Sequence, residues 1–143
     1  MPKAEKDIVI EAPMERVFDV ITDYERYTEF LPDMKAVRVL SRRDNIAVVS
    51  FELELIMRIS YTLRLTEERP SGVVWSLEQA KMMRDNVGGW ALVATPEGHT
   101  HATYGIELTL RGLIPKSVST RLVGQTLPET LQRFKRRVEG MAV

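Results

Sequence analysis

The sequence contains no cysteine, only two histidines and no excess of charge of either sign. Without cysteine the chain has no disulfide, no thiol nucleophile and no thiolate metal site. His99 and His101 alone do not make a histidine-rich metal site. Lysine plus arginine number 20, as do aspartate plus glutamate, so no net field draws the chain to nucleic acid or to an anionic membrane. We therefore expect no metal, no cofactor and no DNA partner.

Long apolar runs are also lacking. No stretch approaches the ~20 apolar residues of a transmembrane helix, and no signal peptide precedes the first expected strand. The 143 residues, 44% of them hydrophobic and 28% charged, have the composition of a globular protein. These observations predict one domain over residues 1–143, located in the cytoplasm, with no integral membrane segment.

The pattern at the end of the chain predicts one long, interrupted amphipathic helix over residues 114–140. In its second half Leu127, Leu131, Phe134 and Val138 recur at helical spacing, so we expect them to be buried. Gly140 stands where a left-handed helix end is common.

The first half of this helix, Pro115 to Gln125, has a thinner apolar stripe of Ile114, Val118, Leu122 and Val123. Between the halves, Thr126 and Glu129 have the spacing of a capping box, and Pro128 cannot donate a helical hydrogen bond. We therefore expect a kink or restart at residues 126–128.

Alternation of apolar and polar residues predicts strands through the middle of the chain. The strongest run, residues 46–68, has apolar residues at almost every odd position and is long enough for two strands joined near Leu55 to Arg58. Further strands are expected at 5–11, 35–43, 73–79, around 88–92 and at 99–111, and short helices from Pro13 and from Tyr24 to Phe30. The predicted fold is α+β: a curved antiparallel sheet of six to seven strands gripping the C-terminal helix, with two short helices after the first strand.

Four segments carry a resemblance to a known family: Ala12 to Phe18, Asp23 to Pro32, Gly89 to Leu92, and Leu131 to Gly140. They resemble the START-like helix-grip (Bet v 1-like) superfamily. Within it they are similar to the branch of polyketide cyclases/dehydrases, coenzyme Q-binding START-domain proteins and the ribosome-association toxin. The resemblance implies a helix-grip fold that hosts ligand carriers, cyclases and interaction proteins alike.

Much of the concave face of such a sheet lies too far from a single helix to be filled by it, so we expect an internal cavity. Alternation and the helical stripe predict its wall as Leu53, Tyr61, Leu63, Trp75, Leu77, Gln79, Trp90, Leu92, Tyr104, Ile106, Leu108, Val118 and Leu122. Large aromatic surface with a few polar tips is typical of a small-molecule site. Ordinary core packing also explains each of these residues singly.

The sequence does not assemble a carboxylate pair, a Ser-His-acid set or a glycine-rich phosphate loop. His99 and His101 fall on the polar face of the last strand, away from the cavity, so we predict no catalytic residue. Arg133, Lys135, Arg136 and Arg137 form a basic cluster. Either a helix C-terminus that favours cations or an RNA or ribosome contact explains it.

Three functions follow. The first is binding or transport of a small hydrophobic ligand such as a quinone, polyketide, isoprenoid or lipid, with the kinked helix as a gate. The second is an enzyme of the polyketide cyclase/aromatase type, in which Tyr61, Tyr104 and Gln79 orient an enolisable chain. The third is an interaction module on the same fold, with the ribosome or a biosynthetic enzyme as its partner.

Overall fold

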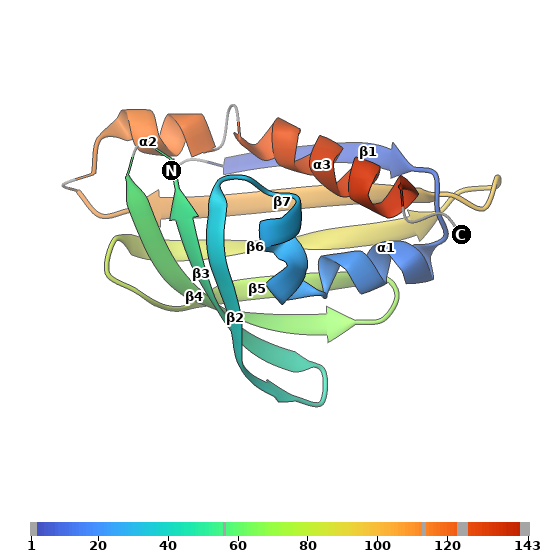
Figure 1. Ribbon diagram of the computed structural model, residues 1–143, viewed down its shortest axis with the longest axis horizontal. Helices are drawn as coiled ribbons and strands as arrows, with labels where there is room; N and C mark the ends of the chain where they lie inside the picture. The colour runs from blue at the N-terminus through green and yellow to red at the C-terminus, as the bar shows by residue number, and fades with distance from the viewer. Residues whose placement is uncertain (1–2, 56, 113, 123–125, 141–143) are drawn as a thin grey trace.

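The computed structural model describes residues 3–55, 57–112, 114–122 and 126–140 (Figure 1). Seven antiparallel strands form one sheet in the order β1-β7-β6-β5-β4-β3-β2. Their bounds are β1 Lys3–Ile10, β2 Met34–Arg43, β3 Ile46–Glu54, β4 Arg58–Glu68, β5 Gly72–Ala80, β6 Met83–Ala94 and β7 Thr100–Leu110. The predicted α+β class and the curved antiparallel sheet are confirmed.

The alternating run of residues 46–68 forms β3 and β4, joined at the predicted place, where the backbone N–H of Leu55 donates to the carbonyl of Met57. Odd-numbered side chains of both strands face the core: Val49 and Ile59 are fully buried, while Arg64 is exposed. The hairpin between β2 and β3 turns without glycine because Asp44 takes the left-handed conformation (φ 55°).

Two short helices follow β1: α1 Met14–Ile21 and the 3₁₀ helix η1 Tyr24–Glu29. Val17, Phe18 and Ile21 are buried as their spacing predicts. Thr100 of β7 ties the start of this region to the sheet, because its hydroxyl donates to the Ala12 carbonyl at 2.7 Å. The two helices thereby close one end of the concave face.

The absence of a side chain at Gly88 of β6 leaves space for the ring of Trp75. A Cβ at this position would lie 2.7 Å from Cζ2 of Trp75 and would also collide with the Gly105 carbonyl. Glycines inside a strand mark either a bulge or a close approach of another part of the chain. At Gly88 the structure shows a close approach between neighbouring strands.

The C-terminal segment forms two helices, α2 Lys116–Arg121 and α3 Leu127–Glu139, so the predicted interruption is present. The four predicted apolar residues of α3 are all buried. Figure 1 shows α3 lying beside β1, with α2 at the far end of the sheet from α1. Val123 and Gln125 lie outside the described residues.

Two local predictions about α3 are wrong. Thr126 makes no capping hydrogen bond through its side chain, since it already has helical dihedral angles; instead its carbonyl accepts from the Thr130 hydroxyl at 2.8 Å. Gly140 ends the helix with φ −75°, in the right-handed region, and its N–H donates to the Arg136 carbonyl. The helix stops without the left-handed residue that glycine would permit.

The buried residues form two clusters. The main one joins α1, η1 and α3 to the sheet and contains Phe18, Trp90 and Phe134. The smaller one contains Ile59, Met83 and Val118, and it fixes α2 to the opposite end of the sheet. A cavity lies between the sheet and the two C-terminal helices.

Candidate functional site

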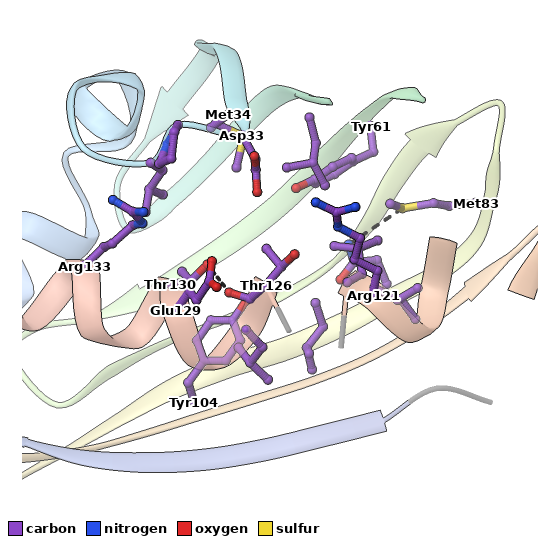
Figure 2. Close-up of a pocket in the computed structure, with 18 residues that line it drawn as sticks. Asp33, Met34, Tyr61, Met83, Tyr104, Arg121, Thr126, Glu129, Thr130 and Arg133 are labelled. Atoms are coloured by element: carbon purple, nitrogen blue, oxygen red, sulfur yellow. Dashed lines mark hydrogen bonds between the residues drawn. The ribbon is translucent and has the colours of Figure 1, made fainter. Parts of the chain in front are cut away.

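The largest part of this cavity has a volume of about 310 Å³, near the lower end of the ~300–1,000 Å³ typical of ligand sites. Its wall comes from the sheet, from the segment between η1 and β2, and from both C-terminal helices. The lining residues are Leu31, Pro32, Asp33, Met34, Leu53, Tyr61, Met83, Asn86, Tyr104, Ile106, Leu108, Arg121, Leu122, Thr126, Leu127, Glu129, Thr130 and Arg133. Figure 2 shows Tyr61 and Tyr104 reaching into this space from different strands.

A second, smaller chamber of about 80 Å³ lies deeper under α3. Its wall is largely aromatic and includes Phe51, Trp75, Trp90 and Phe134. Tyr61 and Tyr104 line both chambers and therefore stand at their boundary.

The structure brings most of the predicted wall residues together. The residues that line one or both chambers are Leu53, Tyr61, Leu63, Trp75, Trp90, Tyr104, Ile106, Leu108 and Leu122. Leu92 and Val118 are buried in the two packing clusters instead, and Leu77 packs half-buried against both.

Gln79 corrects the prediction from alternation, since its side chain is exposed. Thr62 pairs with Gln79 but Leu63 pairs with Leu77, so β5 carries one extra residue opposite β4. Such a bulge reverses the alternation beyond it. The amide of Gln79 is consequently turned away from the cavity.

Asn86 is the wall residue that alternation in β6 could have identified and that we did not predict. It shares its parity with Trp90 and Leu92 and is only 3% exposed. Its side-chain oxygen accepts a hydrogen bond from the indole N–H of Trp75 at 3.0 Å. The side-chain nitrogen of Asn86 lies 3.7 Å from the sulfur of Met83.

The two cavity tyrosines are held by other rings. Tyr61 stacks on Phe51 with ring centroids 5.2 Å apart, and Tyr104 lies 5.5 Å from Trp75 and 4.9 Å from Trp90. Among the described residues, neither hydroxyl has a hydrogen-bond partner. Burial raises the pKa of Tyr61 and of Tyr104 well above the usual value, so both remain neutral hydrogen-bond donors.

Four charged side chains belong to the described wall of the larger chamber: Asp33, Arg121, Glu129 and Arg133. Arg121 and Glu129 are exposed. Within the part of the chain that the structure describes, none of the four forms an ion pair within 4.0 Å. Two of the four are acidic and two are basic, so their formal charges sum to zero.

The histidines lie outside the cavity wall. His101 Nε2 is 2.7 Å from Asp7 Oδ2, in a contact between β7 and β1 where both side chains are exposed to solvent. Over the ranges that the structure covers, no group of three metal-ligating side chains occurs.

Two residues of the basic cluster on α3, Lys135 and Arg137, form ion pairs within the chain. Lys135 pairs with Glu139 at 2.5 Å and Arg137 pairs with Glu29 at 2.5 Å. Arg137 also lies over the ring of Phe30, 5.1 Å from its centroid. These contacts favour a structural role for half of the cluster. No described helix is long and apolar enough to cross a membrane.

Comparison with known proteins agrees with this architecture. The mouse (Mus musculus) protein named steroidogenic acute regulatory protein, mitochondrial, is 25% identical over 155 residues, covering 94% of this chain and 55% of that protein. The chain thus spans about half the length of the curated relatives that it matches.

Two solved structures share the fold. A START superfamily protein from Mycobacterium smegmatis has a TM-score of 0.85 at 16% identity, over 98% of this chain and 99% of that one. The Zhui aromatase/cyclase from Streptomyces sp. R1128 has a TM-score of 0.83 at 15% identity, over 96% and 93%.

A family model described as polyketide cyclase/dehydrase and lipid transport matches residues 10–135, which include strands β2 to β7, the two N-terminal helices, α2 and most of α3. The seven-stranded sheet, the helix across it and this match agree with the START-like resemblance of the sequence. The chain belongs to the polyketide cyclase/dehydrase and lipid transport family.

Proposed function

We propose that this chain binds a small hydrophobic molecule between its sheet and its C-terminal helices, and carries it without transforming it. The cavity of about 310 Å³ is the observation that carries the proposal. Apolar side chains such as Leu53, Ile106 and Leu108 make up much of its wall, and the deeper polar groups are neutral. An apolar molecule gains about 25 cal/mol for each Å² of surface that such a wall removes from water.

The comparisons support this proposal. The family description includes lipid transport, and the matched mouse protein is named as a regulator of steroid formation. The ligand class remains broad: quinones, polyketides, isoprenoids and lipids of suitable size all satisfy an apolar wall with a few neutral hydrogen-bonding groups.

Native mass spectrometry of the purified protein tests the proposal first, through the mass of any co-purified hydrophobic molecule. A titration with the neutral fluorescent dye 6-propionyl-2-dimethylaminonaphthalene then tests the location. Leu122→Trp, which adds volume to the cavity wall, should weaken dye binding at least tenfold. Val74→Trp is the matched control, because Val74 is 58% exposed on the sheet and outside both chambers. Equal binding by both variants, or no binding by the parent, would contradict the proposal.

Cyclisation of a polyketide is the second candidate function. Tyr61 and Tyr104 are oriented in the cavity and stay protonated, so they suit hydrogen bonding to an enolisable chain. Positioning of that kind contributes several kcal/mol to a ring closure. Incubation with a linear poly-β-ketone thioester, followed by liquid chromatography and mass spectrometry, distinguishes the two functions. A cyclised product formed faster than in buffer would show turnover.

A cytoplasmic location and a partner on the ribosome or a biosynthetic enzyme remain predictions from the sequence. Within the basic cluster of α3, Arg136 is exposed and no described residue pairs with it. Pull-down with the parent and with Arg136→Gln tests whether this part of the helix contributes to such a contact.

A further inference from the structure

The amide of Asn86 has only one possible orientation. The indole N–H of Trp75 is a donor and never an acceptor, so the atom of Asn86 that lies 3.0 Å from it must be the side-chain oxygen. The NH₂ group therefore occupies the other side of the amide. Both side chains are buried, Trp75 to 9% and Asn86 to 3% exposure, and the pair holds the amide in place.

This NH₂ group is under-satisfied. Its described contact is the sulfur of Met83 at 3.7 Å, a weak acceptor, and no described oxygen or nitrogen accepts from it. A buried donor that meets only a weak acceptor does not recover the hydrogen bonding that it would have in water. Asn86 lines the larger chamber together with Tyr61 and Tyr104, so an acceptor carried by a ligand can reach it.

The surroundings of Asn86 set the charge of that acceptor. Arg121 is exposed to solvent, while Asn86 is withdrawn from it. A carboxylate seated at the amide would lose its hydration without gaining a buried cation, which is costly. A neutral carbonyl oxygen loses far less hydration and accepts the same hydrogen bond.

We infer that Asn86 is a specificity-determining residue, and that the ligand carries an uncharged carbonyl oxygen, as in a ketone, quinone or ester, which accepts a hydrogen bond from its side-chain NH₂ group. Tyr61 and Tyr104 offer further neutral donors on the same chamber. Trp75 is a positioning residue, because it fixes the amide without lining the larger chamber. The inference rests on the proposed binding function and narrows its ligand class.

Three compounds of similar shape test it by calorimetry: 2-acetylnaphthalene, 2-isopropylnaphthalene and 2-naphthoate. Affinities for the two neutral compounds are divided by each compound's partition coefficient from water into hydrocarbon, which removes the general cost of burying a polar group. The affinity of 2-naphthoate, which is ionised at neutral pH, is compared without this division. On this scale the parent should bind the ketone at least ~10-fold more tightly than the hydrocarbon, because a hydrogen bond measured against an apolar medium is worth more than its net value in water.

Asn86→Leu should remove the preference for the ketone over 2-isopropylnaphthalene. Gln79→Leu is the matched control, since it deletes an amide from the same sheet that faces away from the cavity, and it should keep the preference. If Asn86→Leu does not fold, nuclear magnetic resonance on the parent decides. The Asn86 side-chain amide, identified by its proximity to the Trp75 indole proton, should shift downfield with the ketone and not with the hydrocarbon.

The outcomes separate the two claims. If none of the compounds binds the parent, the proposed function and the inference both fail. If the ketone and the hydrocarbon bind equally, if the preference survives Asn86→Leu, or if 2-naphthoate binds most tightly, the inference is overturned while a hydrophobic binding function stands. A downfield shift confined to Gln79 would also overturn it.

Discussion

The ring of Phe134 in α3 lies 5.1 Å from that of Trp90 in β6, with the two planes at 70°. Phe134 is 2% exposed and also packs edge-on against Tyr27 and Phe30. It thus joins the C-terminal helix to η1, to the residue that follows η1 and to the sheet. Edge-to-face ring pairs of this kind stabilise a core beyond the area that they bury.

Replacing Phe134 by alanine should lower the free energy of unfolding by about 3 to 5 kcal/mol, the cost of truncating a buried aromatic residue. Urea denaturation followed by circular dichroism measures the loss. Gln132→Ala, on the exposed side of the same helix, should change stability by less than ~0.5 kcal/mol. A loss below ~1 kcal/mol for Phe134→Ala would mean that this helix face does not pack on the sheet.

Gly88→Ala should destabilise the protein by about 1 to 3 kcal/mol, as overpacking does. The new methyl group would meet the ring of Trp75 at 2.7 Å and the backbone of Gly105, which cannot move away independently of the sheet. Thermal unfolding is the measurement. Gly112→Ala serves as the control, since nothing lies within 4 Å of its added Cβ. Equal midpoints for the two variants would show that the close approach is absent in solution.

The buried tyrosines should ionise only when the protein unfolds at alkaline pH. Burial raises the pKa of Tyr24, Tyr27, Tyr61 and Tyr104 above the ordinary value of about 10, and for Tyr24 a hydrogen bond to Glu67 adds to the shift. Because the folded-state pKa is the higher one, the folded protein is favoured fully below pH ~10, and this stability is lost as the pH rises above it. We expect phenolate absorbance to appear together with unfolding.

Measurement of near-ultraviolet absorbance and circular dichroism on the same samples checks this prediction. All four tyrosines of the sequence belong to the set. A phenolate signal near pH 10 with unchanged circular dichroism would show that at least one ring is accessible to water.

Replacing both His99 and His101 by glutamine should leave binding of the naphthalene dye, and any turnover, within a few-fold of the parent. Neither histidine lines the cavity, and His101 contacts Asp7 at the sheet surface. Fluorescence titration and the thioester assay give the two measurements. A rate loss on the order of 10²-fold, typical of a missing general acid or base, would place one of them in the chemistry.

The α2 helix should open more readily than α3. One residue of α2, Val118, is buried in the smaller cluster, whereas α3 buries Leu127, Leu131, Phe134 and Val138. Local opening costs less where fewer apolar contacts break. Amide hydrogen exchange should therefore be faster in 116–121 than in 129–138, and the dye should slow it in 116–121. Equal protection of both helices, unaltered by the dye, would exclude α2 as the gate.

Periodicity in the sequence was sufficient to predict the strands, the buried stripe of α3 and the interruption before it. A long alternating run such as residues 46–68 has one arrangement that buries its apolar side chains, and Leu131 and Phe134 meet on one face only in a helix. The turn between β6 and β7 contains Gly98 with a φ of +81°, a conformation that glycine adopts readily.

The tertiary structure decided which of those side chains face the cavity. A single extra residue in β5 turned Gln79 outward, although its position in the sequence continues the parity of Trp75 and Leu77. Asn86 became part of the wall because β6 begins at Met83, earlier than the glycine pair suggested. Strand register depends on pairing with the neighbouring strand, and that pairing is not encoded in the alternation of one strand alone.

The hydrogen bond between Trp75 and Asn86 likewise depends partly on the sequence pattern and partly on the tertiary structure. Each residue has an apolar or polar character readable from the sequence, and each lies on a predicted strand. Only the approach of β5 to β6, permitted by the missing side chain of Gly88, brings the indole N–H to the amide oxygen. The sequence determined that a sheet would wrap around a C-terminal helix. The contacts between strands decided which polar atoms are left for a ligand.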